Sequence, residues 1–179
     1  MKSNKGAAFE REFSKQLSLW WSDGGSKDVF WRTPMSGGKA TVDQRSTHAG
    51  DIRAVLPEGE GFTELFNVEL KCGYPNADFQ RILDGAGEKH EFLSFIEQAK
   101  RDNQLAGSKY WMLVIKRDRK KPLVVLDMAC WSLICPLLLF EGVGTPNIEM
   151  EIGDGEVYAI FRLEDLFKLD PSQVYEALR

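Results

Sequence analysis

The chain has 179 residues, of which 43% are hydrophobic and 28% are charged, a length and composition that suit one domain with one core. Its net charge of −4 counts against simple polyanion binding, because affinity for nucleic acid rests on lysine and arginine. The acid excess is concentrated late in the chain: residues 1–50 carry eight basic and five acidic residues, whereas residues 141–179 carry three and nine. Charge therefore excludes neither a nucleic-acid enzyme nor an acidic enzyme with a small substrate.

The first predicted element is an amphipathic helix over about residues 5–21. Its apolar residues recur at helical spacing, which predicts one face packed on a sheet: Phe9, Phe13, Leu17 and Trp20. Glu10 and Glu12 lie about 200° apart around such a helix, so only one of them can face a given site.

A short strand is predicted over residues 29–32, followed by a polar, glycine-containing loop over residues 33–50. The loop contains Ser36, Lys39, Arg45 and His48. Two interpretations stay open for it, contact with a nucleic-acid backbone or a solvated loop with no binding role.

Two predicted strands follow, one at Gly50-Asp51-Ile52 and one at Val68-Glu69-Leu70-Lys71. Side chains alternate along a strand, so Glu69 and Lys71 share one face while Val68 and Leu70 share the other. The Pro/Gly pattern of residues 56–61 predicts a turn between the two strands. A hairpin with that turn would bring Asp51 beside Glu69 and Lys71.

Paired carboxylates of this kind suit a hard divalent cation. Mg²⁺ keeps several waters and is usually held by one or two carboxylates plus substrate phosphate, so Mg²⁺ or Mn²⁺ is the expected ion. Glu10 would complete the cage from the first helix. A lysine between two acids is kept positively charged, so we assign Lys71 an electrostatic role at the phosphate rather than that of a proton acceptor.

The second half of the chain continues with a helix over about residues 90–105, whose buried stripe contains Phe92, Phe95 and Ile96. Gln98 lies on this helix and either faces the site or is simply exposed. Strands are predicted over residues 110–116 and 122–127, joined by a basic turn at 117–121 that is either a phosphate clamp or solvated.

Beyond residue 127 we expect a helix over 128–140, a hairpin of strands 148–152 and 156–161, and a short helix over 163–169. The apolar run 123–140 is interrupted by Asp127, Ser132 and Pro136, which argues against a membrane span. The chain contains no P-loop, so no nucleotide cofactor is expected, and no serine-hydrolase elbow or zinc-finger spacing.

The chain resembles the PD-(D/E)xK nuclease superfamily, and within it the archaeal-type Holliday junction resolvases and their phage relatives. Four stretches in the first 125 or so residues carry the likeness: 5–12 (KGAAFERE), 32–38 (RTPMSGG), 50–52 (GDI) and 68–71 (VELK). The resemblance implies an α/β fold with a mixed central β-sheet flanked by helices, the restriction-endonuclease-like αβββαβ core. This core would be residues 1–127, with a C-terminal α+β extension at 128–179 packed on the same single domain.

The resemblance also implies roles for single residues. Glu10, Asp51 and Glu69 would hold metal and Lys71 would act on the phosphate. Ser36 and Gln98 would be supporting positions. Lys39 and Arg45 are candidate DNA-binding residues because of their charge in the loop, not because of the resemblance.

The function that follows is Mg²⁺-dependent hydrolysis of DNA phosphodiester bonds, in the first place resolution of Holliday junctions by a phage-type homodimer. Two alternatives stay open: a restriction- or repair-type nuclease on the same fold, and a non-catalytic DNA-binding protein that retains it. The chain has three cysteines, an odd number without the paired spacing of a metal site, and no secretory signal is expected. These features predict reduced thiols in a cytoplasmic protein, in the bacterial host if the gene is carried by a phage.

Overall fold

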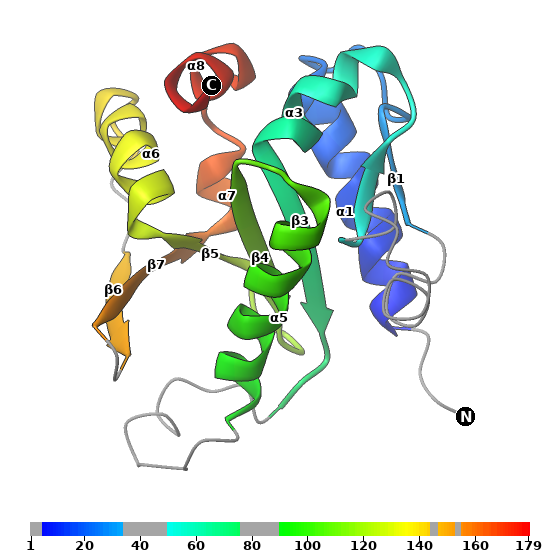
Figure 1. Ribbon diagram of the computed structural model, residues 1–179. Helices are drawn as coiled ribbons and strands as arrows, with labels where there is room; N and C mark the ends of the chain where they lie inside the picture. The colour runs from blue at the N-terminus through cyan, green and yellow to red at the C-terminus, as the bar shows by residue number, and fades with distance from the viewer. Residues whose placement is uncertain (1–4, 34–49, 76–89, 144–146, 153–154) are drawn as a thin grey trace.

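The computed structural model describes residues 5–33, 50–75, 90–143, 147–152 and 155–179 (Figure 1). Its elements in the first part of the chain are α1 (Lys5–Trp21), β1 (Phe30–Arg32), β2 (Ile52–Ala54), the 3₁₀ helix η2 (Pro57–Gly59), α3 (Glu60–Leu65) and β3 (Phe66–Cys72). The second part contains α5 (Glu91–Ala106), β4 (Tyr110–Lys116), β5 (Leu123–Asp127), α6 (Met128–Phe140), β6 (Ile148–Ile152), β7 (Glu156–Arg162), α7 (Leu163–Leu166) and α8 (Pro171–Leu178).

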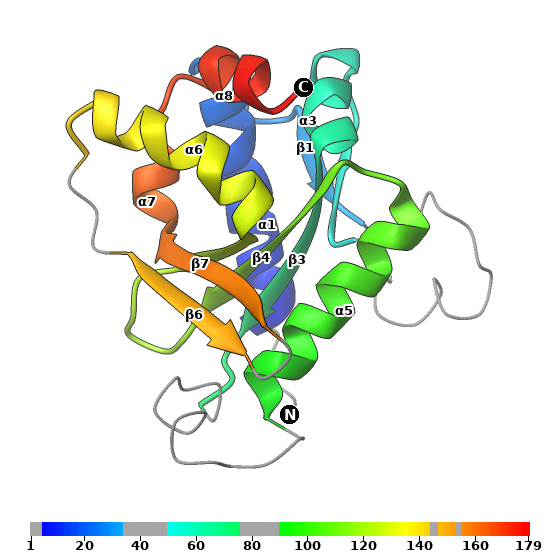
Figure 2. The same cartoon turned by 60° about the vertical axis from the view of Figure 1, so that its left-hand side comes forward.

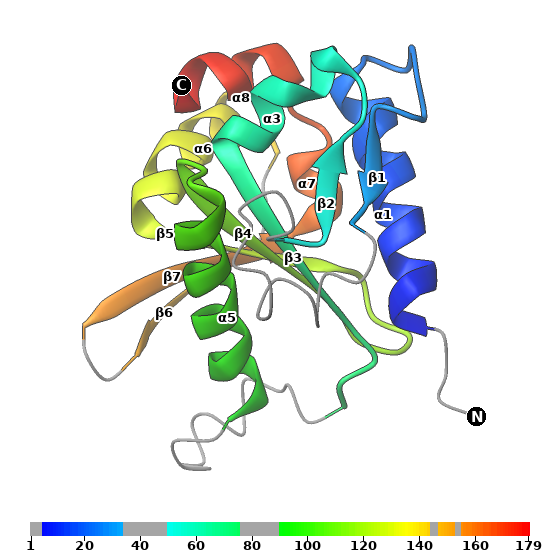
Figure 3. The same cartoon turned by 45° about the vertical axis from the view of Figure 1, so that its right-hand side comes forward.

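The centre of the molecule is a five-stranded mixed sheet in the order β3-β4-β5-β7-β6. β3 and β4 are parallel and α5 connects them, while the remaining neighbours pair antiparallel. β1 and β2 form a separate antiparallel ribbon beside α1 (Figure 3). The predicted α/β class with a mixed central sheet flanked by helices is therefore confirmed.

Helices cover both faces of the sheet (Figure 2). Alternation along β4 sends Met112 and Val114 into the larger core beneath α1, α6 and α8, and sends Leu113 and Ile115 into the smaller core beneath α5. β3 follows the same rule, because its Val68 and Leu70 are buried in the larger core. Glu69 and Lys71 consequently share the opposite face, as the sequence predicted, and the structure shows that this face lies toward α5.

α5 forms one wall of the site, and both of its ends are capped. The His90 side chain accepts a hydrogen bond from the backbone N–H of Phe92, and Gly107 ends the helix in the left-handed conformation with φ of 76°. His90 is thus a buried helix cap with a structural role.

The predicted hairpin between Asp51 and Glu69 is wrong. β2 pairs with β1, and the segment expected to be a tight turn forms η2 and α3. Pro57 begins the first helical turn, and Phe62 and Leu65 recur at helical spacing and are buried. This short apolar repeat makes a packed helix more favourable than an open turn.

The chain after Asp127 joins the same sheet, since β7 pairs with β5 and β6 with β7. This pairing supports the proposal that residues 128–179 and the core 1–127 form one domain. α8 was not predicted, although Asp170 caps it and Pro171 stands at its first position. None of the described helices combines the length and apolar content that crossing a membrane requires.

Candidate active site

A cleft of about 200 Å³ opens at the outer edge of β3. It is bordered by α1, the residues before β2, β3 and α5. Six charged or amide side chains line it: Glu10, Asp51, Glu69, Lys71, Gln98 and Asp102. Five of these six are predicted site residues, which come from four segments that are distant in sequence.

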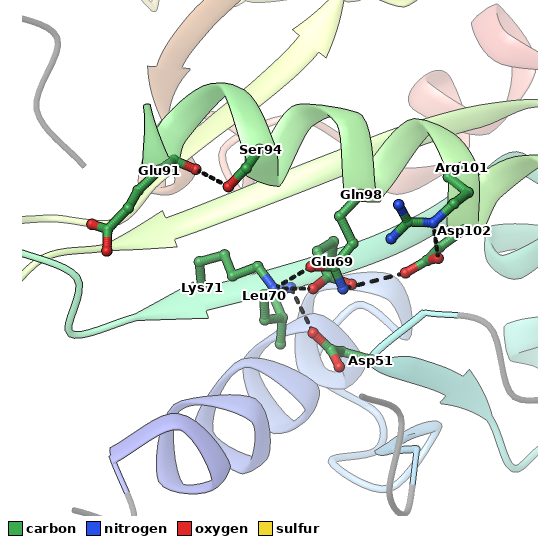
Figure 4. Close-up of polar contacts among 9 residues, drawn as sticks. All are labelled: Asp51, Glu69, Leu70, Lys71, Glu91, Ser94, Gln98, Arg101 and Asp102. Atoms are coloured by element: carbon green, nitrogen blue, oxygen red, sulfur yellow. Dashed lines mark hydrogen bonds and ion pairs between the residues drawn. The ribbon is translucent and has the colours of Figure 1, made fainter. Parts of the chain in front are cut away.

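Asp51 is fixed to β3 through its backbone and its side chain. Its backbone N–H donates to the carbonyl of Val68 at 2.8 Å, and its carboxylate Oδ2 accepts from the backbone N–H of Leu70, also at 2.8 Å (Figure 4). Only 7% of the residue is exposed. Asp51 therefore lies beside Glu69 and Lys71 as expected, although by docking on the strand edge rather than through a hairpin.

Lys71 is held between an acid and an amide. Its Nζ donates to Glu69 Oε1 at 2.5 Å and to Gln98 Oε1 at 2.8 Å (Figure 4). The Phe95 ring lies beneath the ammonium, 5.2 Å from Nζ to the ring centroid. These contacts fix the position of the positive charge inside the cleft, with Gln98 as the residue on α5 that orients it.

Glu69 is 3% exposed, and this burial is the main cause that raises its pKa from 4.5 to about 7. The negative charge of Asp51 raises the pKa further, while Lys71 lowers it. Two buried acids thus repel each other across one cleft. A divalent cation would relieve this repulsion, and carboxylate oxygens are its preferred protein ligands, so the donor set fits such an ion.

Asp102 was missed by the sequence reasoning. It lies one helical turn after Gln98, accepts a hydrogen bond from Gln98 Nε2 at 3.3 Å, and contributes to the raised pKa of Glu69. The four-residue spacing on α5 was an available signal, because residues four apart share a helix face.

Glu10 lines the cleft, but its Oε2 accepts a hydrogen bond from Arg32 Nε at 2.7 Å. Glu12 pairs instead with Lys116, at 3.3 Å, and does not border the cleft. Across the described ranges, no three acidic, histidine or cysteine side chains are grouped closely enough to hold a metal. A ligand role for Glu10 accordingly stays a prediction.

Part of the predicted site cannot be placed. Ser36, Lys39, Arg45 and His48 lie outside the described residues. The basic turn after β4 is described, and two of its charges form ion pairs, Asp118 with Lys5 and Lys121 with Glu164.

Gly50 precedes Asp51 in a conformation that only glycine tolerates well. Its φ is 79°, and a Cβ added there would lie 2.2 Å from the side-chain oxygen of Asn67. The close approach of this backbone to β3 is what allows the hydrogen bonds of Asp51 to form.

We expect Gly50→Ala to lower the free energy of unfolding by more than the roughly 1–2 kcal/mol of a left-handed alanine, because Asn67 must also move. Gly107→Ala is the matched control, since its φ is 76° and nothing lies within 4 Å of the added Cβ. Urea unfolding of both variants measures the difference. Equal losses would mean that the contact with Asn67 relaxes freely.

An acid docked on a strand edge, a Glu-x-Lys pair on that strand and a flanking helix on a mixed sheet define the class of PD-(D/E)xK nucleases. The sequence model of the family described as phage putative PDDEXK endonuclease matches residues 1–169, so the chain belongs to this family. No curated protein and no solved structure matches the chain significantly. Membership makes the protein a phage-type nuclease and implies DNA as its substrate.

Proposed function

We propose that the protein is a Mg²⁺- or Mn²⁺-dependent DNA endonuclease that cuts branched DNA, with a Holliday junction as its expected substrate and a homodimer as its expected form. The observation that carries the catalytic part is the position of Lys71, held by Glu69 and Gln98 beside Asp51 in one cleft. A restriction- or repair-type activity on linear duplex is the alternative on the same fold.

Asp51 and Glu69 would hold the cation, with Glu10 as a third ligand from α1. When bound, such an ion polarises the scissile phosphate and lowers the pKa of a water molecule. The ammonium of Lys71 would orient the attacking water and stabilise the negative charge that develops on the phosphate. Gln98 and Phe95 hold that ammonium, so Lys71 is already positioned for the reaction before the substrate binds.

The deciding experiment compares cleavage of an end-labelled four-way junction, a linear duplex and a single strand with Mg²⁺, Mn²⁺ or EDTA. Symmetric, metal-dependent cuts in the junction alone support resolution by a dimer. Preferential cutting of duplex would move the protein to the restriction or repair type. If none of the three substrates is cut, the protein would be a non-catalytic DNA-binding protein that retains the fold.

The binding of metal can be measured without any cleavage. Because the cation would relieve the repulsion between Asp51 and Glu69, Mg²⁺ or Mn²⁺ should raise the Tm of the wild type at pH 8. Asp51→Asn weakens the proposed site while its side-chain oxygen can still accept from Leu70, so its Tm should respond less. A wild-type Tm that metal leaves unchanged would contradict the assignment of these acids.

Glu10 and Glu12 provide a second test, because they lie on different sides of α1. Glu10→Ala is expected to lower cleavage by about 10–100-fold, as removal of groups that support a metal site commonly does. Glu12→Ala removes an exposed pair with Lys116 and an exposed hydrogen bond from Gln16, both outside the cleft, and should leave cleavage near the wild-type rate. The reverse order in a steady-state assay would show that Glu12 faces the site.

A further inference from the structure

A second groove, of about 560 Å³, lies between α1 and the β1–β2 ribbon. Among the described residues, Asp28 is the single acidic one that lines it. Five basic residues line the same groove: Arg11, Lys15, Lys27, Arg32 and Arg53. This is a pronounced concentration of positive charge in a chain whose net charge is −4.

Most of this charge is free to meet a ligand. Arg11, Lys15, Lys27 and Arg53 are exposed, and they form no ion pair with any residue of the described ranges. Basic groups arranged along one groove bind the phosphates of a nucleic-acid strand and release its counterions. The groove therefore fits a DNA backbone better than a neutral small molecule.

Trp31 adds an aromatic platform to the same groove. It is 53% exposed, and in the β1–β2 ribbon it stands directly opposite Arg53. Cross-strand partners project from the same face, so the indole and the guanidinium lie side by side. Exposed aromatic rings beside arginines are typical of surfaces on which unpaired bases stack.

The groove adjoins the active-site cleft through one ion pair. Arg32 lines the groove, and its Nε donates to Glu10, which lines the cleft. α1 is the shared wall, with Arg11 and Lys15 toward the groove and Glu10 toward the cleft. A strand lying in the groove would thus continue directly to the reacting phosphate.

We propose that this groove binds a DNA strand next to the cut site and stacks an unpaired base on Trp31. The inference rests on the proposed nuclease function and deepens it, because it names the feature of branched DNA that the groove would recognise: a nucleotide that is unpaired, or is drawn out of its pair, at the branch point. Bases within an intact duplex are already stacked on each other and present no free face to an indole.

The test is binding of fluorescein-labelled DNA by anisotropy in EDTA, with three probes: a forked duplex with single-stranded arms, a dT single strand and a blunt duplex. Trp31→Ala should weaken binding of the forked and single-stranded probes by about 5–100-fold and leave the blunt duplex unchanged. Trp31→Phe should retain most of the affinity, because it keeps a stacking face. Phe140→Ala, which truncates an exposed ring outside the groove, is the matched control and should change nothing.

The charged residues are tested with Lys15→Glu and Arg53→Glu, and with Arg179→Glu as the control outside the groove. Each groove variant should weaken binding and flatten the dependence of log affinity on log salt concentration, by about 0.7 per lost phosphate contact on a single strand. If Lys15→Glu and Arg53→Glu bind DNA with wild-type affinity, the groove is not a DNA-binding site. If Trp31→Ala binds the forked probe with wild-type affinity, or loses the same affinity for all three probes, no base stacks on Trp31.

These outcomes are separate from those of the nuclease assay. If the wild type cleaves DNA but Trp31→Ala binds normally, the inference fails while the proposed function stands. If the wild type cleaves no DNA, the proposed function fails whatever the anisotropy shows.

Discussion

Lys71→Ala is expected to lower the rate of DNA cleavage by roughly a hundredfold or more, the usual effect of removing one preorganised group that stabilises transition-state charge. Lys71 is the one cation that borders the described cleft, and it is held there by Glu69 and Gln98. Among the described residues that line the cleft, no second cation can replace its ammonium. Single-turnover cleavage at saturating DNA measures the chemical step, and anisotropy in EDTA measures binding.

If Lys71 acts on the chemical step rather than on DNA binding, Lys71→Ala should lower the cleavage rate but not the binding affinity. DNA binding should stay within a few-fold of the wild type, because the basic groove beside α1 is unchanged. Lys109→Ala is the control, since Lys109 is exposed and contacts the backbone carbonyl of Leu178 outside the cleft. A fully active Lys71→Ala variant would show that this cleft is not the active site.

Glu69→Gln should abolish metal-dependent cleavage and at the same time stabilise the folded protein at pH 8. Burial and the charge of Asp51 raise the pKa of Glu69 in the folded state to about 7, whereas its ordinary value is 4.5. Between these values the folded state binds more protons than the unfolded state. The free energy of unfolding of the wild type therefore falls as the pH rises through this window, and the loss is complete above pH 7.

The variant lacks this titration. The stability of Glu69→Gln relative to the wild type should therefore increase by on the order of 3 kcal/mol between pH 4.5 and pH 8. Urea unfolding in EDTA at several pH values measures the change without any contribution from metal. Glu58→Gln is the control for loss of an exposed carboxylate outside the cleft. A flat difference for Glu69→Gln would mean that Glu69 ionises normally in the folded protein.

The sequence predicted those elements that have a strong, uninterrupted pattern. α1, β4, α6 and β6 begin and end where the sequence pattern placed them, and α1, β4 and α6 each bury an apolar face. The common face of Glu69 and Lys71 followed from strand alternation alone. Asp51 was placed beside them through an expected hairpin that does not form, and Gln98 came from the family resemblance; the structure places both within the same cleft.

The pairing of the strands could not be predicted in the same way. β2 has only three residues, too few for a pattern that specifies its partner strand. The local turn signal at residues 56–61 therefore indicated pairing with β3, whereas β2 pairs with β1. The ion pair between Glu10 and Arg32 and the position of Asp102 are likewise tertiary features. They depend on how α1, β1 and α5 meet around β3, which no local pattern encodes.

The hydrogen bonds of Asp51 have a consequence for aggregation. β3 is an edge strand of the sheet, and edge strands with open N–H and C=O groups invite pairing with other chains. Asp51 occupies two of these groups, the carbonyl of Val68 and the N–H of Leu70. Loss of its carboxylate exposes part of this edge, so Asp51→Ala should yield a less soluble inactive protein than Asp51→Asn, whose amide oxygen can still accept from Leu70.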